Sequence, residues 1–271
     1  MHRLIISSVA ATAALTAAAA ASAQPAPPPA AIEEPSRGWL VQAGYEGFTM
    51  RDISRNQRPP DASPVSWHGE GPAISGRYYI AGRRSAHFFD ASLAGARDFA
   101  YIAPTRTVNA LSGDKASRVE GRYEYRRYFW RDVGADGLDI ALGVQGIGSR
   151  VAFDRHITDV LATRTRIAGG GVSGVIAMRV QRWRLVQFDV AWANGAIVSA
   201  RISDHTGAPA LQETTSGGNW LTDTTVRADW RLTSAARLAV SWRRYFEGYA
   251  SSHYSYSGIW QSLNVGVVYA R

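Results

Sequence analysis

Residues 119–129, with the sequence VEGRYEYRRYF, point to the fold class of this 271-residue chain. Charged side chains occupy the even positions from Glu120 to Arg126, whereas Val119 and Tyr123 belong to an odd, uncharged row. Successive side chains of a β-strand point to opposite faces of the sheet, so such a strand has one charged and one apolar or aromatic face. The stretch therefore predicts a β-strand.

The same two-residue period recurs from Gly38 onward. No uninterrupted apolar window of more than 18 residues remains in this part of the chain, which excludes transmembrane helices from it. An all-β chain is expected, with ten strand-like runs near residues 39–51, 73–81, 86–97, 118–130, 138–150, 163–180, 185–202, 219–232, 237–249 and 259–270.

The connections between these runs alternate in length. Short connections are expected near 82–85, 131–137, 181–184 and 233–236, and longer ones near 52–72, 98–117, 151–162, 203–218 and 250–258. Outer-membrane barrels have short periplasmic turns and longer external loops, and an even strand number returns both termini to one side. We therefore predict an antiparallel up-and-down transmembrane β-barrel of about ten strands.

A twelve-strand barrel is the alternative. Asn194-Gly195 is a strong signal for a two-residue hairpin turn, which would divide the run at 185–202. That turn would place the polar segment 203–218 on the short-turn side and disturb the alternation. Ten strands are preferred for this reason.

The cost of charge in lipid predicts which row faces inward. An Arg at the bilayer midplane costs about 2–4 kcal/mol, so the charged rows should face the lumen. Opposite charges in so narrow a barrel are expected to pair and largely fill it. A wider inventory of inward charges includes Glu46, Arg77, Asp90, Arg166 and Glu247. The predicted lumen charge cluster comprises Glu120, Arg122, Glu124, Arg126, Asp139, Asp189, Asp223, Arg227, Asp229 and Arg243.

Two arginines fall on the apolar rows. Arg127 lies near a predicted periplasmic end, where it can snorkel. Arg244 lies toward the outer leaflet, where it either contacts lipopolysaccharide phosphates or marks a local bulge. Aromatic side chains gather at the strand ends, as in the interfacial belts of membrane proteins. One rim is expected to contain Trp39, Phe129, Trp130, Trp183, Trp230 and Tyr269, and the other Trp220, Tyr249, Tyr254, Tyr256 and Trp260.

The N-terminal residues predict export. Residues 1–23 combine a short positive start, an apolar run and the small-x-small sequence Ala21-Ser22-Ala23, which is typical of a cleavable signal peptide. Residues 24–37, QPAPPPAAIEEPSR, predict a Pro-rich periplasmic tether, and residues 38–271 the barrel. The chain has no cysteine and a net charge of +8. Its aromatic residues alternate away from the basic ones, which argues against nucleic-acid binding.

Few residues suggest chemistry. His253-Tyr254-Ser255 resembles the H-x-S sequence of outer-membrane lipid hydrolases, in which His is the base and Ser the nucleophile, although Tyr256 stands where those families usually have Asn. Asp204-His205 is similar to the Asp and His of outer-membrane proteases, but the acidic pair is missing. The six histidines are scattered without metal-ligand spacing. No catalytic residue, metal or cofactor is predicted.

By architecture, residues 38–271 resemble the small bacterial outer-membrane β-barrel proteins. The resemblance implies an outer-membrane location and, as partners, outer-membrane lipids including lipopolysaccharide and the assembly machinery. Such barrels usually end in an aromatic residue, whereas this chain ends Tyr269-Ala270-Arg271. A structural, surface-binding or narrow solute-transport role is expected. The alternatives are a lipid hydrolase using His253 and Ser255, and a soluble periplasmic barrel that binds an apolar ligand with its apolar rows turned inward.

Overall fold

The computed structural model describes residues 37–54, 65–97, 100–103, 106–108, 115–131, 136–156, 162–183, 185–205, 211–215, 219–250 and 254–270. The predicted signal peptide 1–23 and residues 24–36 of the predicted tether lie outside these ranges. His253 lies outside them as well. The described residues belong to one compact unit, residues 34–271.

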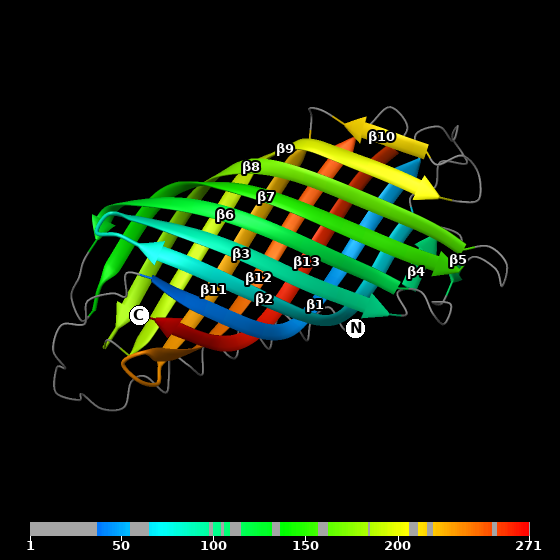
Figure 1. The fold of residues 1–271 in the computed structure, drawn as a ribbon. Helices are drawn as coiled ribbons and strands as arrows, with labels where there is room; N and C mark the ends of the chain where they lie inside the picture. The colour runs from blue at the N-terminus through cyan, green and yellow to red at the C-terminus, as the bar shows by residue number, and fades with distance from the viewer. Residues whose placement is uncertain are drawn as a thin grey trace. The chain divides into compact units, whose positions relative to one another are not determined.

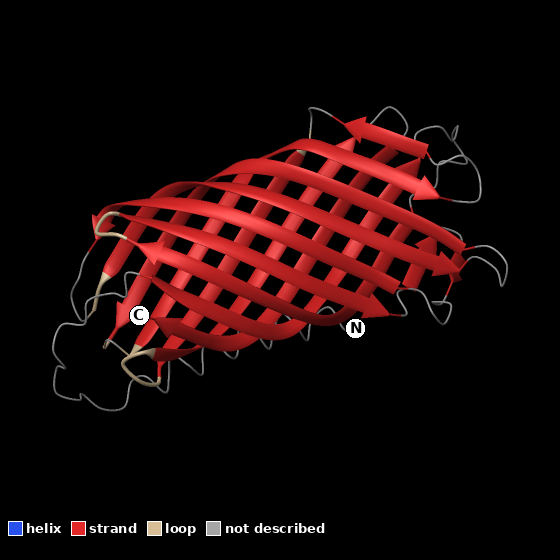
Figure 2. Ribbon diagram, in the orientation of Figure 1, coloured by secondary structure: helices blue, strands red, loops and turns tan. Residues whose placement is uncertain are grey.

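Ten long antiparallel strands form a closed barrel (Figures 1 and 2). Around the barrel each strand pairs with the next along this series, and the last pairs with the first. The predicted ten-strand up-and-down barrel is confirmed. The strands are β1 (Arg37–Ser54), β2 (Val65–Ala81), β3 (Ser85–Arg97), β6 (Lys115–Arg131), β7 (Leu138–His156), β8 (Ala162–Arg182), β9 (Val186–His205), β11 (Trp220–Arg231), β12 (Ala236–Ala250) and β13 (Tyr254–Ala270).

Three short strands extend one end of the barrel (Figure 1). β4 (Ala100–Ala103) pairs with β2 and with β5 (Arg106–Val108), and β10 (Leu211–Thr215) pairs with β9. We call this end, where β1 finishes and β2 begins, the loop end. The opposite end, where residues 82–84 join β2 to β3, is the turn end.

Several strands run further toward the loop end than the alternation predicts. β7 continues to His156 and β13 begins at Tyr254, so their connections shrink to residues 157–161 and 251–253. The predicted difference between long and short connections is lost at these two places. On β7 the apolar residues Val151 and Phe153 are buried on the inner face there, so the pattern of charged inner rows no longer marks the strand.

Asn194 and Gly195 lie inside β9, so the twelve-strand alternative is wrong. Gly195 pairs with Ser173 on β8 and with Leu221 on β11. A Cβ at Gly195 would lie 2.1 Å from the carbonyl oxygen of Val172. The glycine is therefore required by close strand contact and does not mark a turn.

Two β-bulges shift the alternation. Phe129 is the extra residue between the pairs Tyr128↔Ala141 and Trp130↔Ile140, so Phe129 and Trp130 are both exposed on the outer face. Val198 is the extra residue where the β8–β9 register shifts beside Gly170 and Gly171. Such bulges let consecutive residues share one face of a strand.

The outer face of the barrel carries large exposed apolar side chains, and the inner face carries the buried charged rows together with apolar clusters. The soluble barrel with an apolar interior is therefore wrong. Trp192, in the middle of β9, is exposed on the outer face as expected. Other exposed apolar residues of this face include Val41, Ile74, Phe89, Leu93, Val119, Leu142, Val144, Val172, Ile176, Val265 and Val267.

Three positions correct the sequence interpretation. Tyr249 and Trp260, predicted at the rim, are only 3% exposed and lie inside, because they continue the inner rows of Glu247 and Ser262. Arg166 pairs with outward-facing Ala152 and lies beside buried Ile167, so it faces outward. Three consecutive glycines at 169–171 hide the alternation near it.

Arg244 lies in a regular stretch of β12 with no register shift, and its side chain is exposed. The bulge interpretation of Arg244 is therefore wrong, and its contact with lipopolysaccharide stays a prediction.

Candidate functional site

Eight charged side chains form a continuous chain of ion pairs inside the barrel. Their signs alternate along the sequence of contacts, giving four positive and four negative groups. Burial without compensation would cost several kcal/mol per charge, so pairing is the condition for enclosing them. We call this set the lumen chain; in order of contact it consists of Arg77, Asp90, Arg122, Asp223, Arg243, Glu120, Arg118 and Glu46.

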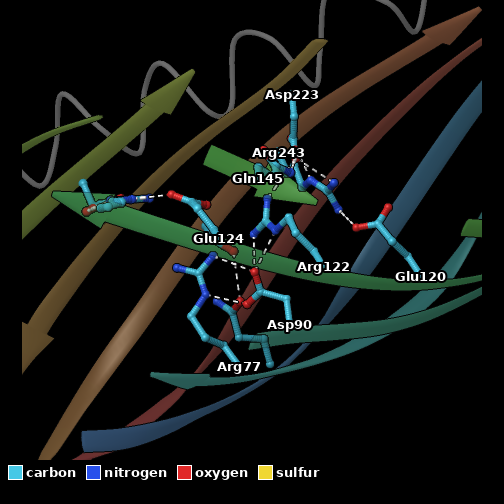
Figure 3. A network of polar contacts seen from close by, with 12 residues as sticks. Arg77, Asp90, Glu120, Arg122, Glu124, Gln145, Asp223 and Arg243 are labelled. Carbon is cyan, nitrogen blue, oxygen red and sulfur yellow. Dashed lines mark hydrogen bonds and ion pairs between the residues drawn. The ribbon is translucent and has the colours of Figure 1, made fainter. Parts of the chain in front are cut away.

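The first half of the lumen chain is centred on two aspartates (Figure 3). Asp90 accepts hydrogen bonds from Arg77 Nε at 2.5 Å and from Arg122 Nε at 2.7 Å. Asp223 Oδ2 accepts bonds from Arg122 Nη1 and Gln145 Nε2, each at 2.9 Å, and from Arg243 Nη2 at 2.8 Å. Each carboxylate thus pairs with two guanidinium groups.

The second half crosses the lumen. Arg243 on β12 also binds Glu120 on β6, the strand directly opposite in the ring of ten. Glu120 in turn binds Arg118, whose Nη1 donates to Glu46 Oε2 on β1 at 3.1 Å. The lumen chain therefore links opposite walls of the barrel through side chains alone.

A second set of ion pairs lies nearer the turn end. Arg126 binds Glu124 on its own strand and, at 2.8 Å, Asp189 on β9. Looser contacts of 3.7–3.9 Å continue from Asp189 through Arg179 and Asp139 to Arg131. A separate pair joins Arg227 to Asp229 at 3.0 Å.

The ten predicted lumen residues all lie on the inner face, and all take part in one of these sets. Arg243 is the most accessible of them, with its side chain 14% exposed. Sequence reasoning missed Arg118, Arg179 and Gln145. Arg118 could have been predicted from the sequence, because it continues the even row of Glu120 and Arg122. A functional role for the ten residues stays a prediction.

Two small cavities lie inside the described part of the barrel. One cavity of about 70 Å³ lies beside the lumen chain and is lined by Arg77, Arg122, Arg227 and Arg243 among others. A second, of about 30 Å³, lies toward the turn end between Tyr79, Phe88 and Arg237, and also touches Arg227. Cavities of this size hold a few water molecules but no sugar or amino acid.

An apolar layer closes over the lumen chain toward the loop end. Phe48 on β1 contacts Trp260 on β13 and, across the lumen, Phe153 on β7, with ring centroids 5.1 and 5.8 Å apart. Arg118 lies against this layer, with its guanidinium carbon 4.8 Å from the Trp260 ring centroid. We call it the loop-end layer; it consists of Phe48, Ala96, Ala116, Ile147, Val151, Phe153, Ile167, Ile197, Ala200, Leu221, Tyr245, Tyr249 and Trp260.

The residues considered for chemistry do not form a described site. The backbone of Ser255 lies in β13 opposite Ala250 and Ile53, but its side chain and the whole of His253 are outside the described set. Asp204 and His205 are consecutive in β9. Among the described residues no group of three or more His, Asp or Glu side chains is arranged to hold a metal ion.

Comparisons with known proteins bear on the fold. No protein-family model matches the sequence, and no curated protein matches it significantly. The structure of the outer membrane protease OmpT from Escherichia coli superposes with a TM-score of 0.64 at 10% identity, covering 87% of this chain and 96% of OmpT. The fold is that of a bacterial outer-membrane β-barrel.

Two further structures are similar more loosely. The outer membrane protein OprG from Pseudomonas aeruginosa has a TM-score of 0.41 and 7% identity, over 87% of this chain and 96% of OprG. The translocator domain of the autotransporter NalP from Neisseria meningitidis has a TM-score of 0.40 and 11% identity, over 98% of each chain. The described part of this chain offers no helical segment suited to spanning a bilayer.

Proposed function

We propose that this protein is an integral outer-membrane barrel whose lumen is closed by its own side chains, and that it acts as a structural or surface-binding protein. The observation that carries the proposal is the lumen chain, which joins opposite walls through Arg243 and Glu120. An aqueous path along the axis would have to separate these groups. Breaking one buried pair costs about 3–5 kcal/mol, which makes spontaneous opening rare.

The outer face supports the membrane placement. Large apolar side chains are exposed on it, and Trp39, Phe129, Trp130 and Tyr269 are between 52% and 63% exposed at the turn end. Amphipathic aromatic rings prefer the membrane–water interface. The turn end is then periplasmic and the loop end external. Export by a cleavable signal peptide of residues 1–23 and insertion by the outer-membrane assembly machinery belong to the same proposal.

Conductance in planar bilayers tests the closed lumen. The purified wild-type barrel is expected to be silent. A combined variant, Glu120→Ser, Arg243→Ser, Phe48→Ala and Trp260→Ala, removes the pair that joins the opposite walls together with part of the loop-end layer, and it is expected to give small discrete steps. Val41→Ala with Val265→Ala changes only the outer face and should remain silent. Discrete conductance steps from the wild-type protein would contradict the closed lumen and favour the narrow solute-transport role.

Cell fractionation tests the location independently. The protein should sediment with outer membranes and resist extraction by sodium carbonate. Release with the periplasm on osmotic shock would exclude membrane insertion.

A further inference from the structure

Three arginines lie together on the outer wall of β7, β8 and β9. Arg150 and Arg201 flank Ala168 in one register row, and Arg166 lies one outward position closer to the loop end. Among the described residues no acidic side chain pairs with any of the three. The nearest acid on this face of the described strands, Asp154, lies opposite Lys115, two outward rows beyond Arg150 and one beyond Arg166, and has an interaction of its own. The wall therefore has a net positive patch.

A shallow depression adjoins the patch on the side of the turn end. Gly121, Gly148 and Gly170 lie side by side in the next register row. A Cβ on Gly121 or Gly148 would meet no atom within 4 Å, so nothing covers the wall there. The depression is broad and open, with a volume of about 470 Å³, and Arg150 and Arg201 are part of its lining.

The patch lies at the height of lipid headgroups in the proposed orientation. On β7, Leu138 is at the turn end, and Val144 is 58% exposed on the outer face. Twelve residues at about 3.3 Å each, tilted near 45°, rise roughly 28 Å from Leu138 to Arg150, and the apolar band of such barrels is about 25 Å tall. Arg150 is therefore among the first outward side chains above the hydrocarbon, in the outer leaflet.

We propose that Arg150, Arg166 and Arg201 bind the phosphate groups of a lipid A headgroup, with an acyl chain lying in the depression beside them. This inference rests on the proposed membrane placement. Guanidinium groups bind phosphate oxygens through paired, charge-assisted hydrogen bonds. Arg150 and Arg201 start from strands about 10 Å apart, so one headgroup with two phosphates can reach both. The glycine row allows a chain to approach the backbone closely.

Thermal unfolding with defined lipids tests the site. The full-length mature barrel is prepared in detergent micelles and titrated with bisphosphorylated lipid A or with dephosphorylated lipid A. Lipid A is expected to raise the unfolding midpoint of the wild type, and the dephosphorylated lipid is not. The variant Arg150→Ala with Arg166→Ala and Arg201→Ala should bind lipid A at least tenfold more weakly. Arg127→Ala, an exposed outward arginine at the turn end, should bind as the wild type does.

Equal binding by the triple variant and the wild type would overturn the inference, as would equal weakening by Arg127→Ala, which would indicate unspecific attraction to positive charge. Heat-modifiable gel mobility shows separately whether each variant forms a barrel. Failure of the proposed function would appear as periplasmic release or wild-type conductance, neither of which depends on these three arginines.

Discussion

Arg122 on β6 donates a hydrogen bond from Nη1 to Oδ2 of Asp223 on β11, at 2.9 Å, across 101 residues of sequence. The two strands are four places apart in the ring, so the contact exists only when the barrel is closed. Local hairpins form without it. The pair therefore stabilises closure itself, and its loss should affect the whole barrel.

Asp223→Ala tests this dependence. The substitution leaves Arg122 and Arg243 without a carboxylate that both contact, and removing one member of a buried ionic set costs about 3–5 kcal/mol. The free energy of unfolding in urea, followed by tryptophan fluorescence in lipid vesicles, should fall by that amount. Glu70→Ala removes an exposed acid and should change it little. If Asp223→Ala lowers the free energy of unfolding by less than about 1 kcal/mol, water replaces the lost carboxylate as the partner of the two arginines.

Gly195→Ala tests the close contact inside β9. Its new methyl would lie 2.1 Å from the carbonyl oxygen of Val172, so the strands must separate, and overpacking of this kind costs about 1–3 kcal/mol. Gly174→Ala is the matched control, because a Cβ there meets no atom within 4 Å. The same urea titration should rank the two variants in this order. Equal stability of the two variants would mean that β8 and β9 can move apart at this position without a cost in free energy.

Much of this fold was predictable from the two-residue period. That period locates ten strands, and the cost of charge in lipid assigns Glu120 and Arg122 to the lumen. It is ineffective where side chains are small or apolar on both faces, as at Gly169–Gly171, and so Arg166 was assigned to the wrong face. Arg179 was missed although apolar Met178 and Val180 flank it, so the same period would have assigned it to the lumen.

Partners within the lumen were not predictable. An even or odd position gives the face on which a side chain lies. It does not give the height of that side chain relative to residues on the opposite wall, because this height depends on the strand tilt and on the register in which β1 pairs with β13. Nothing along the sequence therefore joins Arg243 to Glu120. Similarly, Tyr249 and Trp260 were expected at a rim because only their position near a strand end was considered. The face to which their even or odd position assigns them was not.

Val144→Arg tests which face contacts lipid. Val144 lies halfway up the apolar wall of β7, so an arginine there should cost about 2–4 kcal/mol in a bilayer. Trp39→Arg places the same charge at the turn-end interface, where the charge itself costs about 0–1 kcal/mol. Unfolding in vesicles should show the larger loss for Val144→Arg, and detergent micelles should reduce the difference. The reverse order would contradict the proposed orientation in the membrane.

Phe48→Ala separates the two barriers in the lumen. The substitution removes the ring that joins Phe153 to Trp260 and leaves a cavity in the loop-end layer, which typically costs about 3–5 kcal/mol. Phe48→Leu keeps most of the volume and should cost less than about 1.5 kcal/mol. Neither variant touches the lumen chain, which still crosses the barrel below, so both should remain silent in planar bilayers. Stability should thus fall without conductance. Discrete steps from Phe48→Ala alone would mean that the apolar layer is the sole barrier and that the ion pairs line an open path.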